Sequence, residues 1–172
     1  MSLELKIKNL ETDLHIMGTL VLDSLVSAVR ALEDKDTARA SEVMDKDDEI
    51  DDAYMKIDQD WFELMATEQP VASDLRLSTS ILQASLHLER LGDLSVYLGK
   101  TTHEIHDLPI PESLHKIVVE MGDMVIDMAS TALESLKNRD AELALSTARK
   151  DELINNLYNL SLIHISEPTR PY

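Results

Sequence analysis

Long rows of apolar residues at alternating three- and four-residue spacing constrain this chain more than any other feature. The first row is Leu3, Ile7, Leu10, Leu14, Met17, Val21 and Ala28, with Ser24 completing one step. Such spacing keeps one face of a helix against its neighbours along the whole helix. The sequence therefore predicts a long helix over residues 3–33 that packs lengthwise in a bundle.

Similar apolar periodicity predicts four further helices, over residues 37–68, 71–105, 112–137 and 140–160. Asp36 is suited to cap the second of these helices, and the segment 106–111, with two prolines in its last three residues, is the clearest linker. The chain has 4 Gly and 5 Pro in 172 residues, too few for the many tight turns of an all-β protein. We therefore predict an all-α fold.

The helix over 71–105 carries two apolar rows side by side. The first is Leu75, Thr79, Leu82, Leu86, Glu89, Asp93 and Val96, and the second is Leu77, Ile81, Ala84, Leu88, Leu91 and Leu98. A helix that is apolar on two faces is buried on two sides. We expect this helix to lie centrally or at an interface.

The chain also contains an internal repeat. A shift of 104 residues places residues 17–54 on 121–158 without a gap, and 12 of these 38 positions are identical, Gly18/Gly122 and Asp36/Asp140 among them. Coiled-coil stretches rarely match by chance at Gly and Asp, so a duplication is the better explanation. The expected fold is a pair of tandem three-helix bundles, of which the second is incomplete because its third helix would start beyond the chain.

This repeat defines the expected domains. The first three-helix bundle covers residues 1–106, and two helices of a second bundle cover 107–160. The segment 161–172, SLIHISEPTRPY, contains two prolines and no apolar row, and we expect it to be a non-native tail.

Charge and composition narrow the function classes. Asp+Glu number 33 against 16 Lys+Arg, a net charge of −17, which repels nucleic-acid phosphates and anionic lipid surfaces. No cysteine is present, which excludes disulfides and thiolate metal sites. We find neither a secretory signal nor the roughly 20 apolar residues of a membrane span. The expected location is the cytoplasm, with no direct membrane span and no nucleic-acid partner.

Acidic residues occupy positions that should face the core. Asp47 lies in the apolar row of the second helix, and Asp51 follows one turn later. Glu89 and Asp93 take successive positions in the row of the third helix. Residues four apart point to the same side of a helix, so two such pairs on facing helices can bring four carboxylates together.

Converged carboxylates suggest a metal site, because a bound cation relieves both their desolvation and their mutual repulsion. Oxygen ligands suit Mg, Ca, Mn or iron, and bundle cores can hold such sites. A second interpretation stays open: polar residues in apolar rows can merely fix helix register, and Lys46 or Arg90 could pair with the acids. Glu112-x-x-His115 matches the motif of di-iron bundles but occurs once, at a helix start, where it favours helix N-terminal chemistry.

These segments also resemble a known family. The blocks QPVASDLR (residues 69–76), LERLGD (88–93) and VMDKDDEID (43–51) are similar to the signature of the PhoU family. The resemblance implies two tandem three-helix bundles and a role in regulating phosphate uptake. Similar proteins bind polynuclear iron or zinc clusters through paired E(D)-x-x-x-D motifs. On this chain the motif residues are Asp47, Asp51, Glu89 and Asp93, with divalent or ferric metal ions as the implied cofactors.

The resemblance also implies partners. These are the ATPase subunit of the phosphate ABC transporter and a phosphate-sensing membrane histidine kinase, which the protein would hold in its inhibitory mode when phosphate is plentiful. It further implies a homodimer or larger oligomer, a negative regulator and not an enzyme. The second half departs from the motif, because Asp151 matches Asp47 but Asn155 stands where Asp51 would repeat. The alternatives are a carboxylate-bridged metalloenzyme and a purely structural helical-bundle interaction protein.

Overall fold

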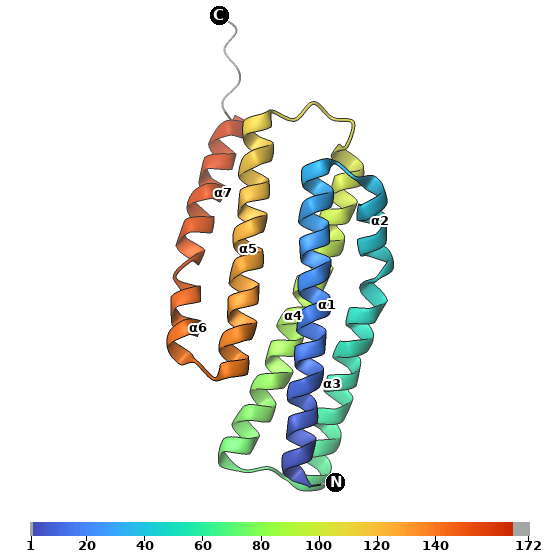
Figure 1. The fold of residues 1–172 in the computed structure, drawn as a ribbon, viewed down its shortest axis with the longest axis vertical. Helices are drawn as coiled ribbons and strands as arrows, with labels where there is room; N and C mark the ends of the chain where they lie inside the picture. The colour runs from blue at the N-terminus through green and yellow to red at the C-terminus, as the bar shows by residue number, and fades with distance from the viewer. Residues whose placement is uncertain (1, 167–172) are drawn as a thin grey trace, which may run out of the picture.

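The computed structural model describes residues 2–166, with side chains described through residue 162. This part of the chain is helical and contains no strand (Figure 1), which confirms the all-α prediction. The helices are α1 (Leu3–Asp34), α2 (Thr37–Asp45), α3 (Asp47–Glu68), α4 (Ala72–Ile105), α5 (Glu112–Asn138), α6 (Ala141–Ala148) and α7 (Asp151–Ser166).

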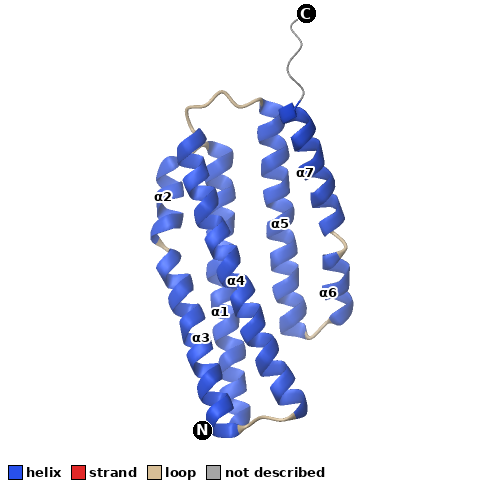
Figure 2. Ribbon diagram, turned by 180° about the vertical axis from the view of Figure 1, so that it is seen from behind, coloured by secondary structure: helices blue, strands red, loops and turns tan. Residues whose placement is uncertain are grey.

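The helices form two groups side by side, seen from the front in Figure 1 and from behind in Figure 2. The first unit, α1–α4, is held together by packing of α1 and α4 against each other and against α2 and α3. In the second unit, α5–α7, both short helices pack on α5. The two units meet mainly where α1 packs against α5. The domain boundary at residue 106 stays a prediction.

The continuous helix predicted over 37–68 is interrupted. Lys46, with φ −93° and ψ 0°, separates α2 from α3. Asp47, Asp48 and Glu49 fill the first turn of α3, where acidic side chains favour a helix N-terminus. The predicted helix 140–160 is also interrupted, between α6 and α7, at the repeat-related position. It then continues to Ser166, past the expected end, while residues 167–172 of the expected tail lie outside the described residues.

The turns from α1 to α2 and from α5 to α6 have the same geometry. Lys35 (φ 54°, ψ 36°) and Arg139 (φ 54°, ψ 38°) both adopt the left-handed conformation that ends a helix. The next residues, Asp36 and Asp140, cap the following helices, and their backbone N–H groups donate to Ala31 O and Ser135 O, each at 2.8 Å. Every pair is 104 residues apart, as the internal repeat predicts.

The core-facing row of α4 differs from the prediction. The buried row runs at three- and four-residue spacing, and most of its members are small residues: Ser78, Ile81, Ser85, Leu88, Gly92, Ser95, Gly99 and Thr102. Leu75 and Leu86, both placed in the predicted row, are 42% and 36% exposed. The prediction that the row containing Glu89 and Asp93 faces the core is therefore wrong. The face of α4 beside that row is the buried one.

Buried hydroxyls explain how polar residues can line this row. Ser85 Oγ donates to Leu82 O at 2.8 Å, Ser95 Oγ to Leu91 O at 3.0 Å, and Thr102 Oγ1 to Leu98 O at 2.9 Å. Each hydroxyl is satisfied by its own helix, so it needs no partner across the interface. Such residues act as small spacers that let α4 approach its neighbours closely.

The contact between α1 and α5 is nearly symmetric. A Cβ added at Gly18 would lie 2.8 Å from Leu133 Cδ2, and a Cβ added at Gly122 would lie 2.8 Å from Val29 Cγ2. Gly18 and Gly122 are related by the repeat, and so are Val29 and Leu133. The two units therefore meet through the same surface used twice, as two subunits do across an isologous interface.

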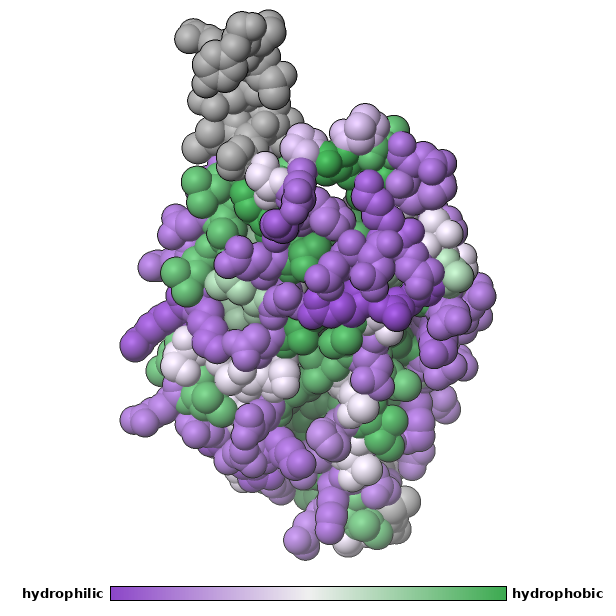
Figure 3. Space-filling model, turned by 45° about the horizontal axis from the view of Figure 1, so that its top comes forward, coloured by the Kyte–Doolittle hydropathy of each residue, from purple (hydrophilic) through white to green (hydrophobic). Residues whose placement is uncertain are grey.

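The second unit has an open apolar groove of about 490 Å³ between α5, α6 and α7. Its lining includes Ala132, Ala144 and Ile154, the repeat equivalents of Ala28, Ala40 and Ile50, which are buried in the first unit. In the first unit α4 covers that surface. Figure 3 shows apolar side chains gathered in the middle of one face of the molecule, between hydrophilic ones.

Helix α1 is long and apolar enough to cross a membrane, judged by length and composition alone. The core helix of a bundle passes the same test, and Leu10, Met17 and Val21 of α1 are buried against the neighbouring helices. The expectation of no membrane span therefore stays a prediction.

The α1–α5 contact generates a stability prediction. We expect Gly18→Val to lower the free energy of unfolding by about 1–3 kcal/mol, because the new side chain meets Leu133 in a packed interface. Urea unfolding followed by circular dichroism measures the change. The double variant Gly18→Val/Leu133→Ala should lose less free energy of unfolding than the sum of the losses in the two single variants, because the smaller side chain at position 133 makes room for valine. Simple additivity of the two changes would contradict the contact.

Candidate metal centre

Four carboxylates lie on two adjacent helices of the first unit. Asp47 is the first residue of α3, and Asp51 lies one turn further on. Glu89 and Asp93 lie one turn apart near the middle of α4. Asp47 and Glu89 are half-buried, whereas Asp51 and Asp93 are exposed. The prediction that these acids face the core is therefore wrong in detail, because they lie at the rim beside the buried row of α4.

The contact of α3 with α4 brings the two acidic pairs together. Ile50 lies between Asp47 and Asp51 in sequence, and its side chain packs over Gly92, which lies between Glu89 and Asp93. A Cβ added at Gly92 would lie 3.1 Å from both Cδ1 and Cγ2 of Ile50. The crossing point of the two helices is thus flanked on each helix by two carboxylates.

Burial and neighbouring acids raise the pKa of Asp47 and of Glu89, the two half-buried members of the group. Burial raises the pKa of the Asp47 carboxyl, and repulsion from Asp51 and then Asp93 raises it further. Burial likewise raises the pKa of Glu89, and repulsion from Asp93, Asp51 and Asp47 adds to the effect. Lys100 opposes the shift at Asp47, and Arg90 opposes it at Glu89. The site therefore carries more negative charge than its cations balance.

Some acids of the first unit have direct ion-pair partners: Asp13 pairs with Lys56, and Glu68 pairs with Lys6. Others, such as Asp48 and Asp52, form no ion pair among the described side chains, so the absence of a partner is not specific to the four acids. Within the described side chains, none of the four site carboxylates forms an ion pair. A donor set of unpaired carboxylate oxygens suits a hard cation.

The arrangement is nevertheless not a closed coordination site. Across the described residues, no three Asp, Glu or His side chains are placed so as to hold one metal ion. Helix position also accounts for part of the pattern, because Asp47 belongs to an acidic first turn that the helix dipole favours. Carboxylate oxygens suit a hard cation, but as placed these side chains do not converge on one ion.

The second unit carries only a remnant of this pattern. Asn155 Nδ2 donates to Asp151 Oδ2 at 3.0 Å, so the amide occupies the carboxylate that corresponds to Asp47. Beside it, Lys150 pairs with Asp127 at 2.5 Å. The expectation that the second unit offers no equivalent site stays a prediction.

The E-x-x-H motif of α5 is engaged in helix and linker contacts. Lys116 pairs with Glu112 at 2.6 Å and lowers the pKa of that carboxyl. His115 Nε2 lies 3.0 Å from Glu33 O, at the end of α1. The two side chains contact different partners and do not converge.

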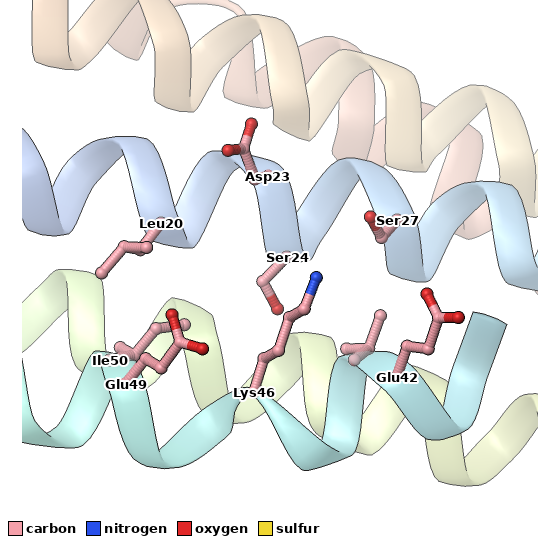
Figure 4. Close-up of a pocket in the computed structure, with 9 residues that line it drawn as sticks. Leu20, Asp23, Ser24, Ser27, Glu42, Lys46, Glu49 and Ile50 are labelled. Carbon is pink, nitrogen blue, oxygen red and sulfur yellow. The ribbon is translucent and has the colours of Figure 1, made fainter.

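Sequence reasoning missed a cavity of about 300 Å³ next to the interruption at Lys46 (Figure 4). Its lining combines apolar residues, hydroxyls and charges: Leu20, Asp23, Ser24, Ser27, Glu42, Val43, Lys46, Glu49 and Ile50. Lys46 reaches from the interruption toward α1, as Figure 4 shows. The signal that could have found it is the alignment of the two repeats. Asp23 and Lys46, which line the cavity, correspond to Asp127 and Lys150, which form an ion pair in the second unit.

Fold and site together define a class: a helical-bundle protein with repeated units and an acidic cluster where two helices of one unit cross. Comparison with known proteins identifies it further. The family model described as the PhoU domain matches residues 14–102 and again residues 118–167. The chain therefore belongs to the PhoU family.

Relatives agree with this assignment. The chain is 32% identical over 157 residues to a phosphate-specific transport system accessory protein PhoU homolog of Pseudomonas putida, covering 91% of this chain and 61% of the relative. It is 32% identical over 158 residues to the homolog of Streptococcus pneumoniae, covering 90% of this chain and 71% of that one. The chain thus spans less than two thirds of the length of the Pseudomonas putida protein.

Solved structures share the fold. The crystal structure of PhoU from Pseudomonas aeruginosa matches with a TM-score of 0.91 at 31% identity, covering 95% of this chain and 78% of that chain. The phosphate transport system regulatory protein PhoU from Streptococcus pneumoniae matches with a TM-score of 0.85 at 29% identity, covering 92% and 74%. These matches confirm the predicted architecture of helical bundles.

The raised pKa values generate a pH prediction for the metal-free protein. Because the folded state holds these protons more tightly than the unfolded state, stability falls as the pH rises above the ordinary values of 3.8 for Asp47 and 4.5 for Glu89. We expect Glu89→Gln to be more stable than the parent at pH 7 by about 0.5 kcal/mol, the size of a like-charge pair on a helix. The advantage should vanish below pH 4.

Urea unfolding with EDTA present, at several pH values, measures this difference. Glu104→Gln is the matched control, because Glu104 is exposed on the same helix and lies away from the four acids. A gain equal in both variants, or one independent of pH, would contradict repulsion within the cluster.

Proposed function

We propose that this chain regulates phosphate uptake and phosphate-starvation signalling, acting by contact with other proteins and not as an enzyme. The observation that carries the proposal is the family match over two segments, supported by relatives named as accessory proteins of the phosphate-specific transport system. The close fit to the Pseudomonas aeruginosa fold supports it as well. By this proposal the protein acts as a negative regulator of phosphate metabolism.

The proposal places a metal on the first unit. Asp47 and Asp51 of α3 and Glu89 and Asp93 of α4 would supply carboxylate oxygens to divalent or ferric ions, including a polynuclear iron or zinc cluster. Such a metal would neutralise the excess charge and join the two helices beside the interruption at Lys46. The support is the unpaired state of the four carboxylates and the raised pKa of Asp47 and Glu89.

The proposed partners are the ATPase subunit of the phosphate ABC transporter and a phosphate-sensing histidine kinase. The chain would act between them as an adaptor in the cytoplasm. Its net charge of −17 favours docking on basic protein surfaces, and it speeds encounter more than it strengthens binding. The proposal includes self-association into a homo-oligomer, as the family resemblance implies.

Two other readings make different predictions. A carboxylate-bridged metalloenzyme of the di-iron type needs histidine ligands near the acids, and His115 instead contacts the end of α1. A purely structural bundle needs no ligand at the acids. Replacing Glu89 and Asp93 by Leu would then stabilise the protein without altering phosphate signalling.

Metal content and partner binding test the proposal. Purified protein should retain or take up Zn²⁺ or Fe³⁺, measured by elemental analysis after gel filtration, and Asp47→Asn with Glu89→Gln should lose most of it. The Glu104→Gln variant should keep the metal. The protein should also co-purify with the phosphate-transport ATPase subunit. If the protein binds neither metal nor the ATPase subunit, the proposed function is overturned.

A further inference from the structure

Helix α3 carries a row of exposed side chains that the core does not use. The row is Asp51, Met55, Asp58 and Phe62, at three- and four-residue spacing, which places them on one side of the helix. Met55 and Phe62 are 66% and 68% exposed, and Phe62 is the only phenylalanine of the chain. Its ring makes an edge contact with the half-buried Trp61, with centroids 6.2 Å apart. The row therefore presents large apolar side chains to solvent between acidic ones.

A second exposed row lies on α4. It contains Leu75, Leu82, Leu86 and Glu89, again at helical spacing, and the sequence pattern predicted that it would face the core. The structure instead leaves Leu75 and Leu86 42% and 36% exposed. The described helices therefore cover this apolar row only in part.

The two rows lie side by side on the outside of the first unit. Helices α3 and α4 pack against each other and run in opposite directions, joined by the short turn 69–71. Asp51 begins one row and helps to raise the pKa of Glu89, which ends the other, so these two ends are neighbours. From there both rows run toward the turn for roughly 15–20 Å. We call this surface the α3–α4 face and define it by six residues: Met55, Asp58, Phe62, Leu75, Leu82 and Leu86.

The charge of α3 determines what this face can attract. The helix carries nine acidic residues and one lysine. That lysine, Lys56, pairs with Asp13 and Asp60, whereas Asp51 and Asp58 form no ion pair among the described side chains. Such a face repels anionic lipids and also a second copy of itself, and it attracts a cationic partner.

We infer that the α3–α4 face is a docking surface for a basic amphipathic helix of another protein. Aromatic residues and methionine are enriched where proteins meet, and an amphipathic helix can lay its apolar side chains along the valley between two packed helices. Lysines and arginines beside that apolar line then meet Asp51 and Asp58. The inference rests on the proposed function only in that the chain acts by contact with other proteins, and it requires no metal.

Fluorescence anisotropy with a synthetic peptide tests the inference. The probe is a labelled peptide of about 20 residues made of Leu and Lys, long enough as a helix to cover the face. Its leucines follow alternating three- and four-residue spacing. The full chain should bind this peptide at physiological salt. The same peptide with Glu in place of Lys should not bind measurably, because like charges repel.

Substitutions of the apolar side chains locate the binding. Met55→Ser with Phe62→Ser should weaken binding by about tenfold or more, as loss of interface anchors does, and Leu75→Ser with Leu86→Ser by at least about threefold. The matched control is Leu145→Ser with Leu153→Ser, at positions 63% and 56% exposed in the second unit. That control should bind within about twofold of the parent. Circular dichroism melting of each variant checks that the fold is intact.

A charge reversal tests the acidic part of the face. Asp58→Lys should weaken binding by about fivefold more than Glu104→Lys does. Both variants change the net charge equally, but Glu104 lies near the end of α4 that is far from the turn 69–71. The comparison therefore separates attraction at the face from attraction to the whole acidic chain.

Several results would overturn the inference. These are no binding of the basic peptide by the parent, equal weakening by face and control variants, or no effect of the substitutions on α4. A parent dimer that Met55→Ser with Phe62→Ser converts to a monomer in gel filtration would also overturn it, because the occupant would then be a second copy of the chain.

Co-purification with the phosphate-transport ATPase subunit is scored separately, so that the two proposals can fail independently. A parent that binds the peptide at the α3–α4 face but does not retain the ATPase subunit supports the inference and contradicts the proposed partner. A parent that retains the ATPase subunit but does not bind the peptide supports the proposed partner and overturns the inference.

Discussion

Close packing of α4 against its neighbours is the constraint on which the first unit depends. Small residues on the buried face of α4 let it approach α2 and α3 closely. At Gly92 and Gly99 the contact is so close that an added Cβ would crowd the neighbouring helix. The serines and the threonine in this row satisfy their hydroxyls within the helix. The cost of burying polar atoms is therefore small, and the gain is dense packing along a helix of 34 residues.

The acidic cluster is a direct consequence of that packing. Two pairs of like charges on separate helices would avoid each other if the helices were free to separate. Burial of Ile50 over Gly92 holds the two pairs near each other instead. Burial and repulsion from the neighbouring acids raise the pKa of Asp47 and of Glu89. We propose that an external cation relieves this repulsion.

Apolar periodicity was enough to predict the long helices α1, α4 and α5, and the repeat predicted the matching turns at Asp36 and Asp140. It could not predict the core face of α4, because Ser and Gly carry no hydrophobic signal although they pack as small residues. It also missed the interruption at Lys46, after which three acidic residues fill the first turn of α3. The site residues were recognised by spacing and resemblance, but whether they face core or rim depends on packing between helices.

Anomalous diffraction from crystals grown with Zn²⁺ or Fe³⁺ tests the central claim most directly. We expect a peak at the metal absorption edge that lies between α3 and α4, within coordination distance of oxygens from Asp47, Asp51, Glu89 and Asp93. A metal bound elsewhere on the chain, or a bound metal that contacts only one of the two helices, would contradict it.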